Sequence, residues 1–298
     1  MHILHAMPTL EITTVIGCPL MCDFCPQVTL RETYTDPVKY LSFANFQTIV
    51  AKIPKHVRID FSGMAEPWIN PECNKMLEHT LSSGYEVAVY TTLVGMTPSN
   101  TDVFIELLKA YPQQIKILCL HLPDEEGHLR GWKNSEVYQY ALTQVLQLDP
   151  DMKKHIGFQV MTMHKTSQLH SDLSHLIIPE LNKQWNGHTR AGSLSGKILN
   201  DIDPTPQHHL PVSCGSTPFY DHNVLLPNGD VVLCCMDYAL KNIIGNLLTS
   251  SYEDLYLSPV MVSLMKENKK FGYSKCSICK SCTNAKSHNI ARNHWNPR

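Results

Sequence analysis

The stretch GCPLMCDFCPQ, residues 17–27, places three cysteines within eight positions of one another. Cys18, Cys22 and Cys25 directly follow LEITTVI (10–16), a run rich in β-branched residues that predicts a strand. A cysteine group of this kind could hold zinc, form a disulfide, act as a redox dithiol or hold an iron–sulfur cluster. The choice among these four decides which fold and which chemistry the rest of the chain is expected to have.

The spacing of these cysteines separates the four possibilities. A structural zinc site has four ligands, usually in two pairs, and here the next cysteine is the distant Cys73. A redox dithiol needs two cysteines, and an odd total of eleven without a secretion signal is a poor disulfide framework. Three thiolates on a short loop suit an iron–sulfur cluster in which one iron keeps an open coordination position. Cys73 and Cys119 stand alone in apolar surroundings and are expected to be buried packing residues.

Composition narrows the class of protein. The 298 residues are 43% hydrophobic with a net charge of −2, which allows one large domain or two smaller ones. There is no basic stripe, so no nucleic acid partner is expected. We find neither a secretion signal nor an apolar run of the roughly 20 residues that cross a bilayer. The expectation is a cytoplasmic protein without a membrane partner.

Strand-like runs alternate with helix-like segments up to about residue 200. Strands are predicted at five runs and, more weakly, at a sixth: 10–16, 57–63, 86–92, 115–122, 156–162 and 188–194. A helix is expected over 43–53, ended by Pro54, and another from an N-cap at Asn70 to about Gly84. Such alternation implies parallel strands with right-handed crossovers. The sequence therefore predicts an α/β sheet or barrel with its chemistry at the C-terminal ends of the strands.

A polar stretch with three prolines, 200–215, breaks the alternation. After it, segment 223–235 is hairpin-like, with a tight turn expected at Asn228-Gly229. A helix around 251–267 and a cysteine-rich tail follow, with little apolar content, so a metal site would help this unit to fold. The predicted division is into domains of residues 1–205 and 206–298.

The first cysteine group carries an aromatic residue, Phe24, directly before its third cysteine. The pattern Cys-x3-Cys-x-aromatic-Cys resembles the hallmark of the radical S-adenosylmethionine (radical SAM) enzymes. The resemblance implies a partial (β/α)6 TIM-like barrel in which Cys18, Cys22 and Cys25 hold a [4Fe–4S] cluster. In that family S-adenosylmethionine binds the open iron, and its reductive cleavage yields a 5′-deoxyadenosyl radical that abstracts hydrogen from a substrate.

A second motif, FSGMAEP at 61–67, ends the second predicted strand and resembles the family's Gly-Gly-Glu-type motif. The resemblance implies that Gly63, Glu66 and Pro67 contact the amino group of S-adenosylmethionine. An ammonium group needs carbonyl or carboxylate oxygens, and a glycine lets backbone approach it closely. By their positions, four further residues are expected to contact the cofactor: Phe24, Thr92, Val160 and Met161. For Val160 and Met161 the alternative is that residues 158–162 form a plain core strand.

The second cysteine group resembles the SPASM and twitch extensions of radical SAM enzymes. It reads Cys214-x14-Gly229-x4-Cys234, followed by Cys-x2-Cys-x2-Cys in the tail. Two auxiliary clusters need about eight thiolates, which this unit lacks. We therefore expect one auxiliary [4Fe–4S] cluster held by Cys214, Cys234 and two of the last three cysteines, and a zinc site remains an alternative. The tail cysteines are Cys276, Cys279 and Cys282.

Two residues near the second group are candidate catalytic residues. Cys235 adjoins Cys234, and neighbours on a strand point to opposite faces, so both cannot readily hold one cluster. Cys235 is either an incidental thiol or the hydrogen-atom donor that an epimerase requires. Arg190 is the preferred candidate for substrate contact among the polar residues at predicted strand ends, which are His121, Asp124, Glu125, Glu126, His164 and Arg190.

The short C-terminal unit resembles that of the aminocyclitol dehydrogenase and sugar epimerase of aminoglycoside pathways. This implies an oxidoreductase or epimerase that acts on a small sugar-like molecule and receives electrons from a flavodoxin- or ferredoxin-type donor. Modification of a ribosomal peptide is the alternative, although a cysteine loop starting at residue 18 leaves no room for a leader-binding domain before it. A non-catalytic iron–sulfur or zinc protein would not explain why Phe24 and Glu66 accompany the cysteines. The substrate itself stays open.

Overall fold

The computed structural model describes residues 7–162, 168–184, 189–194 and 205–288. Its largest feature is a sheet whose first six strands run parallel and alternate with helices, as the sequence predicts. These strands are β1 (Thr9–Ile12), β2 (Arg58–Phe61), β3 (Val87–Thr91), β4 (Ile115–Leu122), β5 (Phe158–Thr162) and β6 (Leu181–Gln184). Because β6 does not pair with the opposite edge, the barrel is open.

The expected strand at 188–194 is wrong. The sixth strand is β6, and Arg190–Gly192 form a short 3-10 turn instead. Arg190 and Ala191 have positive φ angles of 47° and 50°, which an extended strand cannot contain. The LNKQ sequence of β6 has no run of apolar residues that would have marked it.

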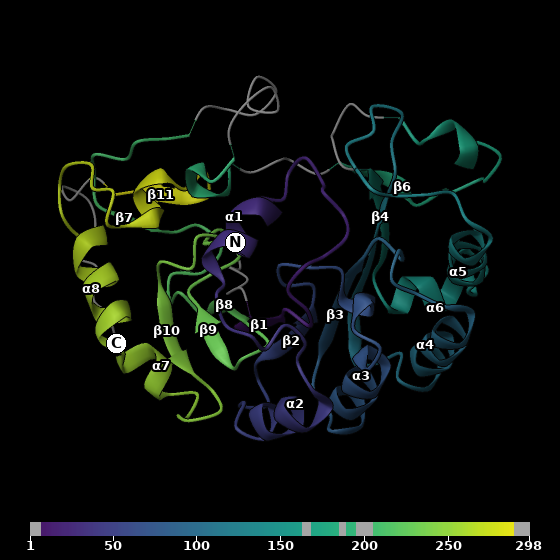
Figure 1. Cartoon of the computed structure of the whole chain (residues 1–298), viewed down its shortest axis with the longest axis horizontal. Helices are drawn as coiled ribbons and strands as arrows, with labels where there is room; N and C mark the ends of the chain where they lie inside the picture. Colours follow the sequence, from purple (N-terminus) through teal and green to yellow (C-terminus); the bar gives the residue numbers. More distant parts are fainter. Residues whose placement is uncertain (1–6, 163–167, 185–188, 195–204, 289–298) are drawn as a thin grey trace.

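Helices follow the strands: α1 (Gln27–Thr33), α2 (Phe43–Val50), α3 (Cys73–Ser82), α4 (Pro98–Ala110), α5 (Glu136–Leu146) and α6 (Pro150–His155). Of these, α2 to α6 cover the outer side of the sheet, whereas α1 lies apart from them (Figure 1). The helix expected to start at Asn70 begins at Cys73, with Glu72 as its N-cap. The Asn70 side chain instead donates to the carbonyls of Thr14 and Leu41 and so ties the start of this segment to the loop after β1. Among the described helices, none is long and apolar enough to span a membrane.

The two faces of the sheet differ in chemistry. Successive side chains of a strand point to opposite faces, and on β1 Leu10 and Ile12 are fully buried in the core beneath the helices. Glu11 therefore points to the concave face, as does Asp60 on β2, which is paired with it in register. Parallel strands are usually apolar on both faces. Charged residues inside this barrel thus mark the concave face as the place for function.

The C-terminal unit extends the same sheet. Its strands are β8 (His222–Leu225), β9 (Asp230–Val232) and β10 (Ile243–Asn246), and the hairpin between β8 and β9 turns at Gly229, with φ 88°. Strand β8 pairs parallel with β1, which gives one nine-stranded sheet in the order β10-β9-β8-β1-β2-β3-β4-β5-β6. The division into two domains near residue 206 remains a prediction. The pairing of β8 with β1 means that the two parts share one sheet.

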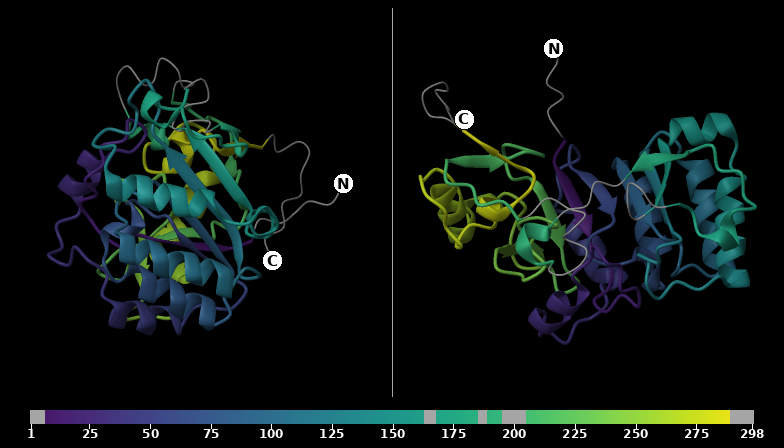
Figure 2. Two further views of the ribbon diagram at one scale, coloured as in Figure 1. Left: turned by 90° about the vertical axis from the view of Figure 1, so that its right-hand side faces the viewer. Right: turned by 90° about the horizontal axis from the view of Figure 1, so that it is seen from above.

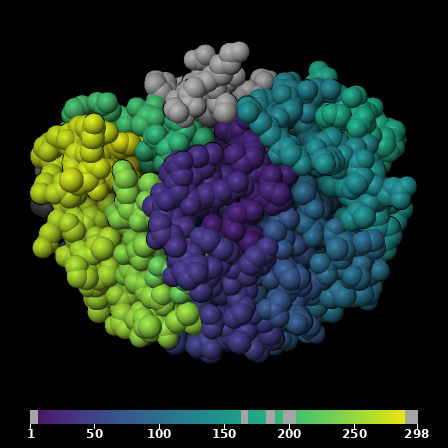
Figure 3. Space-filling view, viewed as in Figure 1, coloured from purple at the N-terminus to yellow at the C-terminus, as the bar shows by residue number. Residues whose placement is uncertain are grey.

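A small second sheet joins β7 (Val212–Cys214) and β11 (Ala285–Ser287). The helix expected at 251–267 is split into α7 (Asp254–Leu257) and α8 (Pro259–Asn268), because Ser258 caps α8 and Pro259 occupies its first turn. These elements lie at one end of the molecule and β4 to β6 at the other, with β1 between them (Figure 2). On the surface the N-terminal segment, in purple, likewise separates the C-terminal elements from the middle of the chain (Figure 3).

Candidate active site

The first cysteine loop lies directly beyond β1, at the edge where the parallel strands end. Cys18 is buried, and Cys22 and Cys25 are partly exposed. In the metal-free chain, burial raises the pKa of Cys18 to about 11 and that of Cys22 well above its usual value. Thiols in such a setting become thiolates when a cation such as iron stabilises them, so the loop suits a metal cluster.

A loop after β4 covers this cysteine loop. The backbone N–H of Met21 donates to the Arg130 carbonyl at 2.9 Å, and that of Asp23 to the His128 carbonyl at 3.0 Å. Arg130 also forms an ion pair with Asp23 at 2.5 Å. The Phe24 ring is buried against His128, with ring centroids 5.4 Å apart. Local sequence patterns could not predict this contact, because the two loops are about a hundred residues apart.

The segment FSGMAEP packs against the same end of β1. Gly63 has φ 55°, and a Cβ there would lie 2.6 Å from the backbone nitrogen of Thr13, so only glycine fits. Thr13 Oγ1 accepts the Met64 N–H at 3.0 Å, and Thr14 Oγ1 donates to the Pro67 carbonyl at 2.8 Å. The glycine thus allows the close backbone approach expected of it, here between β1 and the end of β2.

Glu66 is buried in a network of hydrogen bonds with the end of β3. Its carboxylate accepts from Thr91 Oγ1 at 2.6 Å and from both the N–H and the Oγ1 of Thr92 at 2.7 Å. Burial raises its pKa, and these donors oppose that shift. The structure therefore brings together Glu66 and Thr92, two residues that were each expected to contact the cofactor. Their contact with a cofactor stays a prediction.

The two candidates on β5 lie on opposite faces. Val160 is fully buried in the core beneath the helices, so its side chain cannot reach a cofactor on the concave face. The expectation that the Val160 side chain contacts the cofactor is therefore wrong, and only the Val160 backbone is left for such a contact. Met161 pairs in register with His121 of β4, whose side chain lies on the concave face.

Cys235 and four other cysteines of the C-terminal unit line one cavity of about 80 Å³, which is space for several water molecules. Cys214 comes from the end of β7, Cys234 from the segment after β9, and Cys279 and Cys282 from a 3-10 turn, Ile278–Ser281, and its C-cap. Cys276 is exposed and does not line the cavity. The arrangement favours Cys214, Cys234, Cys279 and Cys282 as the ligand set.

The separation of the sulfurs bears on the zinc alternative. A tetrahedral zinc with Zn–S bonds of about 2.3 Å would bring its sulfur ligands to about 3.8 Å from one another. In the described part of the chain, three metal-binding atoms lie within 4.8 Å of one another only at Asp124, Glu126 and His128. Among the described residues, neither cysteine group has three sulfurs that close together in the metal-free chain. The zinc alternative therefore stays open beside an iron–sulfur cluster.

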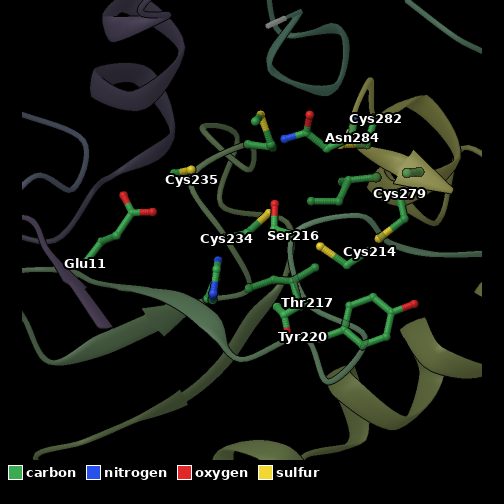
Figure 4. A pocket seen from close by; sticks show the side chains of 15 residues that line it. Glu11, Cys214, Ser216, Thr217, Tyr220, Cys234, Cys235, Cys279, Cys282 and Asn284 are labelled. Carbon is green, nitrogen blue, oxygen red and sulfur yellow. Dashed lines mark hydrogen bonds between the residues drawn. The ribbon is translucent and has the colours of Figure 1, made fainter. Parts of the chain in front are cut away.

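The opposite wall of this cavity is formed by Cys235 and Glu11 (Figure 4). Cys234 packs with the main core and Cys235 with a separate cluster. Both lie beyond the end of β9 at Val232, so the expected strand alternation does not apply to them, and both line the cavity. Glu11 hydrogen-bonds with Cys235 and with Ser62, and burial together with the nearby Asp60 raises its pKa to about 7. Glu11 is a candidate site residue that the sequence did not single out. A carboxylate in the middle of the apolar run LEITTVI was the available signal.

Arg190 lies between the two cysteine-bearing parts. Its Nε donates to the Phe24 carbonyl at 3.3 Å and its Nη1 to the Cys235 carbonyl at 3.2 Å. The guanidinium also lies over the Tyr238 ring, 5.5 Å from the centroid. The structure thus puts Arg190 at the centre of the site, and its contact with a substrate stays a prediction.

The other polar strand-end residues divide into three groups. Burial and the nearby Arg190 charge lower the pKa of His121 to about 4, so this ring is neutral at the concave face. Asp124 is buried and bonded to His128, whereas Glu125 and Glu126 are exposed. His164 lies outside the described residues.

Comparisons with known proteins agree with this geometry. Residues 214–283 match the SPASM family, an iron-sulfur cluster-binding domain. Among solved structures, the fold resembles BtrN in complex with AdoMet and 2-DOIA, with 19% identity, 95% of each chain covered and a TM-score of 0.57. It also resembles native anSMEcpe with bound AdoMet and Cp18Cys peptide, with 13% identity, 93% of this chain and 88% of that chain covered and a TM-score of 0.51. No curated protein matches the chain by sequence.

These findings confirm the α/β fold with a parallel sheet and the iron–sulfur domain predicted from the sequence. Because the sequence identities to these solved structures are below 20%, the structural likeness shows a shared fold and no more.

Proposed function

We propose that this chain, which carries a SPASM iron–sulfur domain on a radical SAM fold, uses S-adenosylmethionine to remove a hydrogen atom from a small polyhydroxylated molecule and so oxidises it. One observation carries the proposal. Arg190 donates to the Phe24 carbonyl in the three-cysteine loop and to the Cys235 carbonyl beside the cysteine-lined cavity, and Glu11 lies on the wall of that cavity. A substrate held between the loop and the cavity would have a source of radicals on one side and an electron acceptor on the other.

The residues at both sites fit the cofactors. Cys18, Cys22 and Cys25 offer three ligands and leave one position of a four-iron cluster open. Beside them, Gln27 Oε1 is buried without a hydrogen-bond partner among the described residues, so it can accept from a ligand such as an amino group. When bound, a [4Fe–4S] cluster with S-adenosylmethionine supplies a hydrogen-abstracting 5′-deoxyadenosyl radical, and an auxiliary [4Fe–4S] cluster supplies an acceptor for one electron.

Glu11 is the residue suited to take the hydroxyl proton during oxidation. Converting a carbinol to a carbonyl removes a hydrogen atom from carbon, a proton from oxygen and one further electron. A general base works best when its pKa is near the working pH, and that of Glu11 is raised to about 7. Its bond to Cys235 and its place on the cavity wall keep the carboxylate facing the shared space.

The lining of the barrel suggests the class of substrate. Arg58 makes two 2.7 Å bonds to Asp60, and neutral His121 and Tyr90 lie nearby with ring centroids 6.5 Å apart. Hydroxyl and amino groups of a substrate can form hydrogen bonds with such donors and acceptors, which an apolar substrate cannot. A sugar-like or aminated ring suits this surface, and the similarity to the fold of BtrN, solved with 2-DOIA, supports it.

The test uses the protein reconstituted anaerobically with iron and sulfide. We expect about eight irons per chain, as two four-iron clusters require, and formation of 5′-deoxyadenosine from S-adenosylmethionine with dithionite or a flavodoxin-type reductant. Cys22→Ala should abolish that cleavage, while Cys73→Ala, at a buried packing cysteine, should retain it. If the wild-type protein forms no 5′-deoxyadenosine, the proposal is wrong.

Epimerisation is the second candidate, because the Cys235 thiol faces the same space as Glu11. An epimerase returns a hydrogen atom from a thiol to the substrate radical, so its product would contain solvent deuterium when the reaction runs in D2O. An oxidation would instead give a carbonyl product without solvent deuterium at that carbon. Loss of product with Cys235→Ala but retention with Glu11→Gln would favour the epimerase.

A peptide substrate is the third candidate, since the fold also resembles anSMEcpe solved with a peptide. Deuterium transfer into 5′-deoxyadenosine separates the two substrate classes. Deuterium transfer from deuterated sugars or aminocyclitols would support a small-molecule substrate. Deuterium transfer only from peptides would show that the substrate is a peptide instead.

A further inference from the structure

The C-terminal unit reaches the first cysteine loop through one side chain. Tyr238, in the segment between β9 and β10, is buried, and its hydroxyl lies 3.3 Å from the Sγ of Cys25. The two residues are 213 positions apart in the chain. Tyr238 belongs to an apolar cluster with Tyr34 and Met64 against which Cys25 packs, so water does not compete for its hydroxyl.

A second donor meets the same sulfur. Gln27 Nε2 lies 3.2 Å from Cys25 Sγ and also donates to the Met64 carbonyl at 2.6 Å. Gln27 is the first residue of α1 and is buried. Among the described contacts, Cys25 thus has one donor from its own loop region and one from the C-terminal unit.

Arg190 keeps Tyr238 in position. Its guanidinium lies over the Tyr238 ring while it donates to the carbonyls of Phe24 and Cys235. A cation over an aromatic ring is attractive, more so away from water. Arg190 therefore joins the ring to both the cysteine loop and the backbone beside Cys235.

The direction of the Tyr238 bond follows from the chemistry of a cluster ligand. A cysteine bound to iron is a thiolate and can only accept, so the Tyr238 hydroxyl must be the donor. Hydrogen bonds to cluster sulfurs are among the factors that set reduction potentials. They stabilise the reduced cluster more, because it carries the greater negative charge.

We propose that Tyr238 is a positioning residue through which the C-terminal unit raises the reduction potential of the cluster at Cys18, Cys22 and Cys25. This rests on the proposed function, because it requires a cluster at that loop. The C-terminal unit then has two effects: it holds an auxiliary cluster, and it makes the first cluster easier to reduce. A rearrangement that moved Tyr238 away from Cys25 would make the first cluster harder to reduce.

The test is an anaerobic redox titration of the reconstituted full chain, followed by EPR. The first cluster's signal is identified by its change when S-adenosylmethionine is added, and the potential is then measured without it. For Tyr238→Phe we expect the ratio of reduced to oxidised first cluster at a fixed potential to fall about tenfold, a shift of about 59 mV to more negative values for one electron. The auxiliary cluster should keep its potential.

Tyr34→Phe is the matched control. Tyr34 lies in the same apolar cluster, but its hydroxyl donates to the Val38 carbonyl and not to a cysteine. It should leave the first cluster's potential unchanged. Equal shifts in both variants, or no shift in Tyr238→Phe with normal iron content, would overturn the inference.

One further measurement tests the hydrogen bond itself. In D2O, pulsed EPR should detect an exchangeable deuteron near the first cluster that Tyr238→Phe lacks and Tyr34→Phe retains. This readout holds even if the variant binds less iron. If the wild-type chain shows no signal that responds to S-adenosylmethionine, the proposed function itself is wrong. If the signal responds but Tyr238→Phe does not change the cluster's reduction potential, only the inference about Tyr238 is wrong.

Discussion

Gly63 is the residue at which the motif after β2 meets β1 most closely. A Cβ would lie 2.6 Å from Thr13 N and 2.7 Å from Ile12 C, both backbone atoms, and the φ angle of 55° disfavours any other residue. Gly63→Ala should therefore lower the free energy of unfolding by about 3 kcal/mol or more, since it combines overpacking with backbone strain. Urea unfolding of the metal-free chain measures this.

Gly84→Ala is the control for that change. Gly84 has φ 79°, but a Cβ there would meet nothing within 4 Å. Only backbone strain acts, so the expected loss is about 1 kcal/mol. Equal losses at Gly63 and Gly84 would contradict the close contact with β1. The variant at Gly63 should also lose S-adenosylmethionine cleavage, whereas that at Gly84 should keep it.

The raised pKa of Glu11 makes stability depend on pH. Its pKa is about 7 in the folded chain against an ordinary 4.5, so folding takes up a proton between those values. The free energy of unfolding should therefore fall as the pH rises from 4.5 to 7, by about 3 kcal/mol. Glu11→Gln should remove this slope in metal-free protein and leave stability near pH 4.5 unchanged. Glu106→Gln, at an exposed helix position, should leave the slope intact.

At the scale of elements, the cavity defines which tail cysteines hold the auxiliary cluster. Cys279 lines it, whereas Cys276 is exposed and lies outside it. Cys279→Ser should therefore reduce the iron content from about eight to about four per chain, and Cys276→Ser should leave it near eight. Iron and sulfide analysis after reconstitution decides this. Loss of four irons in both variants would place Cys276 in the ligand set.

The elements also show what the sequence could predict. Strands β1 to β5 follow from their apolar runs, and the hairpin turn from Asn228-Gly229, because these signals are local. Strand β6 was missed because it is a polar edge strand. The prediction of a strand at 188–194 was wrong because the backbone at Arg190 and Ala191 has positive φ angles. No local sequence pattern predicts these angles.

In the candidate site, too, only the parts with a local sequence signal could be predicted. The cysteines and the Gly63 motif are marked by their spacing, which is visible in the sequence. Glu11 required knowing which face of β1 looks inward, and the Tyr238–Cys25 contact joins segments 213 residues apart. Contacts of that kind are set by how the sheet is assembled. Spacing along the chain carries no information about them.

At the scale of the whole molecule, the two parts should unfold together. Strand β8 pairs with β1 along its length, and Lys52 of the barrel donates to the carbonyls of Leu247, Leu248 and Ser250. A fragment of residues 1–205 would leave one edge of β1 unpaired, and unpaired edges favour aggregation. We expect the full chain to unfold in one cooperative transition and the fragment to show none.

Calorimetry and circular dichroism of both proteins test this prediction. Lys52→Met is a useful comparison, because it removes only the side-chain link and should lower the transition temperature without splitting it. Two separate transitions in the full chain, or a cooperatively folded fragment, would show that the barrel is complete without β8.

The pairing of β1 with β8 also imposes an order on synthesis. At about 5–20 residues per second, the ribosome makes β8 roughly 10–40 seconds after β1, and Tyr238 later still. During that interval the nascent chain presents Cys18, Cys22 and Cys25 without the side chain that later covers Cys25. Iron delivered to the emerging chain would therefore meet an uncovered loop, and the later-translated segment that carries Tyr238 would close over it.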